Sequence, residues 1–195
     1  MSKIGFAGLD HLGLNSAIAA AAKGLSVICF HNDIKKISNL KKGKIHFKEP
    51  SLRNMLGKNK KKIVFTSDQK KLSTCNIVYI SLDVLTDSNG RSNLFHIKNL
   101  IKIVIKVLSK KAVLVILSQV PPGFTRSIKW NKKKLFYQVE TLVLGNAMKR
   151  SLFPERLIIG TSNPNKPIKP IGIIKENLIS FKKNTLYKSK KKLSL

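Results

Sequence analysis

Gly8 and Gly13 lie in the stretch "KIGFAGLDHLGLNSAIAAAAKG", whose residue types and spacing could do chemistry. A short apolar run precedes an alanine-rich segment here, which predicts a strand that ends at Gly8 and a helix that begins near Leu12. The free N–H groups and the dipole at such a helix start attract anions. The pattern G-x-G-x-x-G binds the phosphates of a dinucleotide in this way. The candidate phosphate contacts are Gly8, His11, Leu12 and Gly13.

Asp10 occupies the position of the middle glycine in this pattern. That glycine lets the pyrophosphate approach the backbone, whereas aspartate places a side chain and a negative charge there. At about 4 Å, with an effective dielectric constant of about 20, repulsion between two like charges is about 4 kcal/mol. This repulsion corresponds to roughly three powers of ten in affinity. We therefore expect a weakened or lost cofactor site unless the Asp10 carboxylate turns away or is protonated.

The end of the second predicted strand, in "VICFHND", is where an acidic residue would bind the adenosine ribose. His31 stands at that position, and Asp33 follows two residues later. An imidazole is a weak acceptor for a ribose hydroxyl, and aspartate is a residue type that caps helix starts. The sequence thus predicts His31 at the ribose, with a reduced contact, and Asp33 as the cap of the next helix.

Strand and helix signals alternate along residues 1–160, which we interpret as one dinucleotide-binding domain. Apolar runs predict strands at residues 3–8, 26–30, 62–66, 77–81, 112–117, 135–139 and 156–159. Helical signals occur at residues 12–23, 33–40 and 94–108 and in "EPSLRNML". This order predicts an α/β fold, a Rossmann-like, doubly wound and mostly parallel sheet with helices on both faces. Residues 161–195 are predicted to form a basic tail or partial element, poorly ordered at its end.

The net charge of +29 would attract phosphates, nucleic acid and anionic membranes. However, 33 of the 38 basic residues are lysine, whereas arginine is the preferred reader of bases and the preferred bidentate phosphate ligand. The lysines also occur along the whole chain rather than in one segment. We interpret them as a compositional bias on a solvated surface and do not expect nucleic-acid binding, which stays an alternative.

The remaining composition excludes several protein classes. Two cysteines, Cys29 and Cys75, cannot form a disulfide framework, and their apolar surroundings predict buried packing. The four histidines lack metal-ligand spacing, so no metal site is expected. No apolar run approaches the roughly 20 residues of a membrane helix. The N-terminus lacks the layout of a secretory signal, so we expect a cytoplasmic protein without a membrane partner.

Five blocks occur in one order along the chain: "KIGFAGLDHLGL", "EPSLRNML", "TDSNGRSNL", "SQVPPGFT" and "VETLVLGNAMKRSLFPERLIIG". Together they resemble the N-terminal domain of the UDP-glucose/GDP-mannose dehydrogenase family over roughly residues 2–160. The resemblance implies an oxidoreductase that uses NAD as its cofactor. Its implied substrate is a nucleotide-sugar, whose C6 hydroxyl is oxidised to a carboxylate through a thiohemiacetal on a cysteine, as in UDP-glucose 6-dehydrogenase.

The resemblance also implies roles for single residues. Lys36 falls where some members have a basic residue near the ribose, Thr86 matches the end of a cofactor loop, and Ser118 matches a serine before "VPPG". Glu140 matches a glutamate that helps to activate water or hold the thioester step, which a carboxylate can do as a general base. Leu142 belongs to the same loop, which contacts the substrate in the family.

Several features depart from the family pattern. The departing positions are Asp10, His31, Asp83, Val84, Leu85 and Gln119. The chain also ends where the sugar-binding domain of the family would begin, and neither of its cysteines has the context of the catalytic thiol. We therefore expect that the catalytic C-terminal domain is absent and that the chain is inactive alone. Three hypotheses stay open: a module that works with a separate chain carrying that domain, a degenerate non-catalytic remnant, and a basic polyanion-binding protein.

Overall fold

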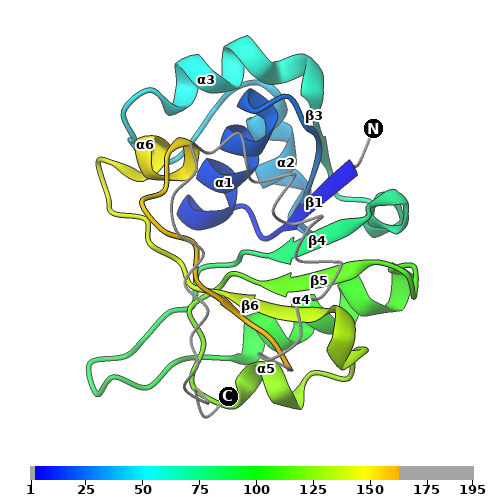
Figure 1. Ribbon diagram of the computed structural model, residues 1–195. Helices are drawn as coiled ribbons and strands as arrows, with labels where there is room; N and C mark the ends of the chain where they lie inside the picture. Colours follow the sequence, from blue (N-terminus) through cyan, green and yellow to red (C-terminus); the bar gives the residue numbers. More distant parts are fainter. Residues whose placement is uncertain (1–2, 163–195) are drawn as a thin grey trace.

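A seven-stranded sheet forms the centre of the fold in the computed structural model, which describes residues 3–162 (Figure 1). The strand order is β3-β2-β1-β4-β5-β6-β7, in which β7 alone is antiparallel to its neighbour. The strands are β1 (Lys3–Ala7), β2 (Ser26–Phe30), β3 (Ile63–Thr66), β4 (Ile77–Ile80), β5 (Val113–Ile116), β6 (Leu135–Gln138) and β7 (Ile159–Gly160). The predicted doubly wound, mostly parallel sheet is confirmed, because the order grows away from β1 in both directions.

Helices cover both faces of this sheet, which confirms the predicted layers. One face carries α1 (His11–Ala22), α2 (Ile34–Lys41), α3 (Leu52–Asn59) and α6 (Ala147–Leu152). The other face carries α4 (Phe95–Val107), α5 (Phe124–Ser127) and the 3₁₀ turn Gln69–Thr74. Two further 3₁₀ turns, Lys60–Lys62 and Lys132–Lys134, precede β3 and β6.

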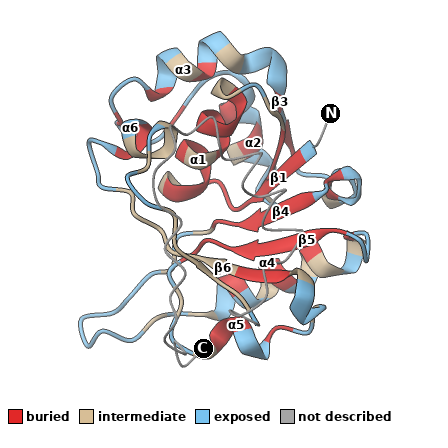
Figure 2. Ribbon diagram, in the orientation of Figure 1, coloured by how far each residue is buried: buried red, intermediate tan, exposed pale blue. Residues whose placement is uncertain are grey.

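The central strands form because their apolar side chains are buried on both faces, as Figure 2 shows for β4 and β5. Successive side chains point to opposite faces. Tyr79 stacks on Phe6 on the α1 side, with the ring centroids 5.0 Å apart, whereas Val78 and Ile80 belong to the α4 side. The sheet is therefore a rigid base for the loops that follow its strands.

Two glycines allow the close approach of α1 to this sheet. Gly8 has a φ of +96°, and a Cβ atom there would lie 2.5 Å from the backbone nitrogen of Leu82. A Cβ atom at Gly13 would lie 1.9 Å from the carbonyl oxygen of Gly8. Both positions therefore require glycine, the first for the tight bend after β1 and the second for the packing of α1.

The structure differs from the sequence-based expectation mainly where the elements are short. The predicted strand at residues 156–159 is displaced, because β7 pairs with β6 only through Gly160 opposite Tyr137 and Ile159 opposite Gln138. The helix α5 and the turn Gln69–Thr74 are too short to show a helical period and were not predicted. Of the predicted tail, residues 163–195 lie outside the described residues.

Cys29 and Cys75 are both buried and free, which confirms the prediction of core packing. Burial raises the pKa of both thiols, that of Cys75 to about 12, so neither is a ready nucleophile. Within residues 3–162, no helix is long and apolar enough to cross a membrane. The same part of the chain contains no group of three or more His, Cys, Asp and Glu residues that could hold a metal ion.

Candidate functional site

The loops that follow β1, β4, β5 and β6 meet at the carboxyl edge of the sheet and enclose a pocket of about 190 Å³. This edge is where ligands bind in open α/β sheets, at the point where the strand order reverses. The pocket is lined by His11, Leu12, Asp83, Val84, Gln119, Glu140, Leu142 and Leu144. The structure therefore brings the predicted cofactor residues at the start of α1 to the same cavity as the predicted loop of Glu140.

The carboxylate of Asp10, the unexpected residue of the glycine-rich turn, is held by groups outside α1. Its side chain makes no capping hydrogen bond to α1. Instead, its carboxylate pairs with the ammonium group of Lys36 and accepts a hydrogen bond of 3.4 Å from the backbone N–H of Asp83. Lys36 therefore compensates the charge of Asp10, whose carboxylate stays beside the backbone of Asp83.

Asp83 places a carboxylate at the N-terminus of α1. Its two oxygens accept hydrogen bonds from the backbone N–H groups of His11, at 3.2 Å, and Leu12, at 3.3 Å. Partial desolvation and then the nearby Asp10 carboxylate raise the pKa of Asp83. The sequence marked Asp83 only as a departure from a family pattern. An acidic residue three positions after a buried strand was the available signal.

His31 and Asp33 form the turn between β2 and α2. The Asp33 carboxylate accepts a 3.0 Å hydrogen bond from the Lys36 N–H, so its predicted role as the helix cap is confirmed. Nδ1 of His31 accepts a 3.0 Å hydrogen bond from the Asp33 N–H. Burial and then Lys36 lower the pKa of His31, which favours the neutral ring. Because Nδ1 is used as an acceptor, the neutral ring carries its hydrogen on Nε2 and offers a donor there.

Glu49 connects the start of α1 to the start of α6. Its carboxylate accepts hydrogen bonds from Nε2 of His11 at 3.0 Å and from the backbone N–H groups of Gly145, at 3.0 Å, and Ala147, at 2.9 Å. These bonds outweigh the effect of burial and lower the pKa of Glu49. Sequence reasoning missed this residue, although it opens the quoted block "EPSLRNML".

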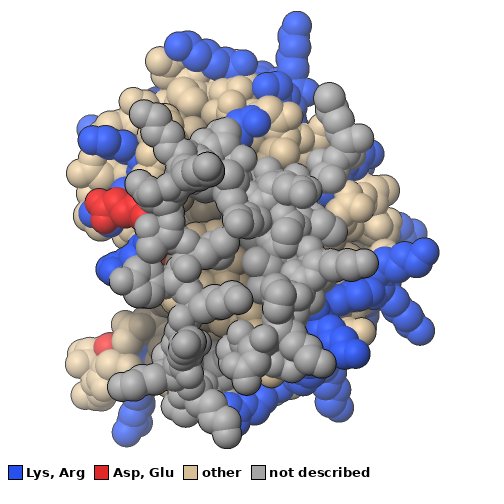
Figure 3. Space-filling view, viewed as in Figure 1, with Lys and Arg blue, Asp and Glu red and all other residues tan. Residues whose placement is uncertain are grey.

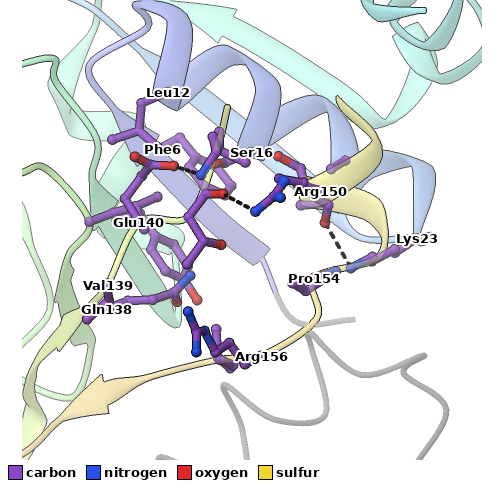
Figure 4. Close-up of a pocket in the computed structure, with 18 residues that line it drawn as sticks. Phe6, Leu12, Ser16, Lys23, Gln138, Val139, Glu140, Arg150, Pro154 and Arg156 are labelled. Carbon is purple, nitrogen blue, oxygen red and sulfur yellow. Dashed lines mark hydrogen bonds between the residues drawn. The ribbon is translucent and has the colours of Figure 1, made fainter. Parts of the chain in front are cut away.

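The loop after β6 holds Glu140 and Leu142 at the pocket. The Glu140 carboxylate accepts hydrogen bonds from the Leu142 N–H and, at 3.1 Å, from the side-chain amide of Gln119. Figure 4 shows a second pocket, which this loop also lines, where Arg150 donates to the Thr141 carbonyl at 3.3 Å. Glu140 is therefore fixed on both sides while it faces the cavity.

Lys23 links α1 to α6 behind the same loop, because its ammonium donates to the Ser151 carbonyl at 3.2 Å (Figure 4). Burial lowers the pKa of Lys23 to about 8. The contact ties the C-terminal end of α1 to the helix that follows the Glu140 loop. Both ends of α1 are thus connected to α6, one by Lys23 and the other by Glu49.

Ser118 and Thr86, two further predicted cofactor residues, lie outside this pocket lining. Ser118 is buried at the end of β5, where its hydroxyl donates to the Ile80 carbonyl at 3.3 Å. Thr86 lies in an exposed loop and pairs with Ser92 in an isolated bridge. The structure thus brings together the residues of the α1 turn, Lys36, Glu140 and Leu142, but places Thr86 apart from them.

The backbone of this site fits a dinucleotide, and its charges modify that fit. The positions of Gly8 and Gly13 provide the narrow turn that a pyrophosphate needs. The amides that would hold the phosphate are bonded to Asp83. In Figure 3, lysine and arginine side chains are seen over several elements of the described part of the chain.

The sequence matches the UDP-glucose/GDP-mannose dehydrogenase family, NAD binding domain, over residues 2–176. The UDP-glucose 6-dehydrogenase TuaD of Bacillus subtilis is 29% identical over 175 residues, which cover 84% of this chain and 38% of TuaD. The UDP-glucose 6-dehydrogenase of Rickettsia bellii is 30% identical over 169 residues, which cover 82% of this chain and 39% of the relative.

Two solved structures have the same fold. The GDP-mannose dehydrogenase of Pseudomonas aeruginosa, solved as a ternary complex, gives a TM-score of 0.79 at 22% identity over 91% of this chain and 44% of that one. An NDP-N-acetyl-D-galactosaminuronic acid dehydrogenase of Methanosarcina mazei gives a TM-score of 0.80 at 21% identity. The match covers 93% of this chain and 43% of that one. The chain spans about two fifths of the length of the curated relatives that it matches. The family match over residues 2–176 shows that this chain belongs to the UDP-glucose/GDP-mannose dehydrogenase family and carries its NAD-binding domain.

Proposed function

We propose that this chain is the cofactor-binding part of a nucleotide-sugar 6-dehydrogenase of the UDP-glucose type. The observation that carries the proposal is the shared pocket, in which His11 and Leu12 of the α1 turn face Glu140 and Leu142 of the loop after β6. A cofactor held at the turn and a sugar held at the loop would meet in this cavity. The relatives named UDP-glucose 6-dehydrogenase support this choice of substrate class.

Different residues of the chain would bind the cofactor and act on the substrate. The glycine-rich turn lets the cofactor backbone approach α1, and Lys36 and His31 lie at the ends of the neighbouring elements, where the ribose would bind. Glu140 would act as a general base toward water beside the reacting carbon, with Gln119 holding its carboxylate in position. When bound, NAD supplies the acceptor for the hydride that leaves the sugar.

The covalent step of the family requires a thiol from elsewhere. Cys29 and Cys75 are the two cysteines of the chain, and both are buried with raised thiol pKa values. Neither lines the pocket at the carboxyl edge. We therefore propose that the complete reaction needs a further polypeptide segment that carries the nucleophile and most of the sugar contacts.

Two measurements test this function. Isothermal titration calorimetry is expected to show saturable NAD binding at about millimolar concentration, which corresponds to a binding free energy of about 4 kcal/mol. With UDP-glucose and NAD, the chain alone should form no NADH, whereas mixing it with the catalytic part of the Bacillus subtilis relative should restore NADH formation. NADH formation by the chain alone would contradict the need for an external thiol. Absence of NAD binding by the folded chain would contradict the cofactor role.

A further inference from the structure

We propose that the Asp83 carboxylate is an internal anion that occupies the phosphate position at the N-terminus of α1 and competes with the cofactor for it. The negative charge of Asp83 then sets the affinity of the site for a diphosphate. This inference rests on the proposed function for the identity of the cofactor. The competition itself is inferred from the contacts of Asp83 with the start of α1.

The hydrogen bonds of Asp83 are the first part of the argument. His11 and Leu12 are the first two residues of a helix of twelve, and their N–H groups have no partner within the helix. The two oxygens of Asp83 accept from both groups, at 3.2 Å and 3.3 Å. A phosphate at a helix start uses the same donors in the same direction. The carboxylate and a cofactor phosphate therefore cannot occupy this position together.

The register between β1 and β4 places Asp83 at the start of α1. Ala7 of β1 is paired with Ile80 of β4. Asp10 and Asp83 each follow one of these paired residues by three positions. The Ser81 N–H donates to the Ala7 carbonyl at 2.8 Å, and the Ser81 hydroxyl donates to the Gly8 carbonyl at 2.9 Å. These bonds fix the backbone before Asp83 against the turn that precedes α1. The carboxylate thus reaches the helix start from a neighbouring strand.

The charges around Asp83 determine how readily it can be neutralised or displaced. Asp10 faces it from the turn before α1, His11 faces it from α1, and Glu140 shares its pocket from the loop after β6. Lys36 of α2 is engaged with Asp10. Partial desolvation and then the neighbouring Asp10 carboxylate raise the pKa of Asp83. Asp83 also has an exposed side, from which a ligand could displace it.

Asp83→Asn is the variant that tests the competition. Asparagine keeps the size of the side chain and one acceptor oxygen for an α1 amide, but it removes the charge. Asp87→Asn is a matched control, because Asp87 lies in the same exposed loop and accepts from the Asn89 and Arg91 N–H groups, outside the pocket. We expect Asp83→Asn to bind NAD and inorganic pyrophosphate at least about tenfold more tightly than the unchanged chain. Asp87→Asn should change neither affinity by more than about twofold.

Nuclear magnetic resonance gives a readout that is specific to the site and independent of NAD. In the unchanged chain, the amide signals of His11 and Leu12 should shift with pH, following a carboxyl group whose pKa lies above that of an ordinary aspartate. In Asp83→Asn that titration should be lost, and added pyrophosphate should shift the same two amides. Retention of the titration in Asp83→Asn would overturn the proposal.

The combined results separate this inference from the proposed function. A gain in affinity for both NAD and pyrophosphate supports both. A gain for pyrophosphate alone supports the role of Asp83 and counts against NAD as the ligand. Equal affinities of the unchanged chain and Asp83→Asn for both probes overturn the inference, and measurable NAD binding in that case leaves the proposed function in place.

Discussion

The Glu49 carboxylate lies 3.0 Å from Nε2 of His11 and joins the first residue of α1 to the start of α6. His11 lines the pocket, and α6 follows the loop that carries Glu140. This buried carboxylate therefore fixes the two halves of the candidate site relative to each other. The same contact leads to a prediction about stability and to one about pH.

Replacing Glu49 by alanine should destabilise the fold. The change leaves the Gly145 and Ala147 N–H groups and the His11 ring without their acceptor, so we expect a loss of about 3 kcal/mol in the free energy of unfolding. Urea denaturation would measure it, with Glu155→Gln on the exposed surface as the control. A loss below about 0.5 kcal/mol, as expected for a substitution on the surface, would show that the hydrogen bonds of Glu49 do not stabilise the fold.

The stabilising effect of Glu49 should disappear in acid. Its pKa in the folded chain is lowered from the ordinary value of 4.5, because its hydrogen bonds outweigh burial. Its contribution is thus fully present above that value and is lost as the pH falls through the folded-state pKa. We expect the difference in unfolding free energy between the unchanged chain and Glu49→Gln to shrink over this range. A difference that stays constant into strong acid would contradict a stabilising role of the ionised Glu49 carboxylate.

Asp10→Gly should strengthen the binding of NAD by about tenfold. The change restores the glycine of the turn pattern and releases Lys36 from its ion pair, which leaves a cation near the ribose position. Since Asp10 makes no capping bond to α1, the cost to the helix should be small. Calorimetry would compare Asp10→Gly with the double variant Asp10→Gly/Lys36→Met, which should lose part of the gain. Unchanged affinity in Asp10→Gly would show that Asp10, paired with Lys36, does not weaken the binding of NAD.

Gly13→Ala should destabilise the chain by about 3 kcal/mol or more. A Cβ atom there would lie 1.9 Å from the carbonyl oxygen of Gly8 and 2.7 Å from the hydroxyl of Ser81, so α1 would have to move away from the sheet. Gly57→Ala in α3 is the matched control, since nothing lies within 4 Å of its added Cβ atom. That change should stabilise the helix by about 0.5–1 kcal/mol. Similar thermal unfolding of the two variants would refute the tight contact at Gly13.

The alternation of strands and helices could be predicted because it depends on local patterns. Runs of apolar residues mark the buried strands, as in β5, and the spacing of Ile97, Ile101 and Val104 marks the buried side of α4. The two glycines of the first turn could be predicted equally well, since few residue types other than glycine fit a tight turn between a strand and a helix. Short elements such as α5 were missed because four residues are about one helical turn, and a periodic apolar pattern is recognisable only over several turns.

The carboxylates of the site could be seen in the sequence, but their partners could not. Asp83 bonds to residues 72 and 71 positions earlier in the chain, and Glu49 bonds to Ala147, 98 positions later. The direction of Asp10 likewise depends on Lys36, 26 positions away on another helix. Such contacts follow from which strands are neighbours in the sheet and in which register.

The sequence by itself determined the order of the elements, the glycine-rich turn and the burial of both cysteines, because hydrophobic periodicity and backbone sterics act over a few residues. Only the tertiary structure decided what occupies that turn. Parallel pairing of β1 with β4 sets the loops after them side by side, so the amides of His11 and Leu12 meet Asp83 while Asp10 turns to Lys36. The sheet register therefore determines which charged side chain lies at the start of α1.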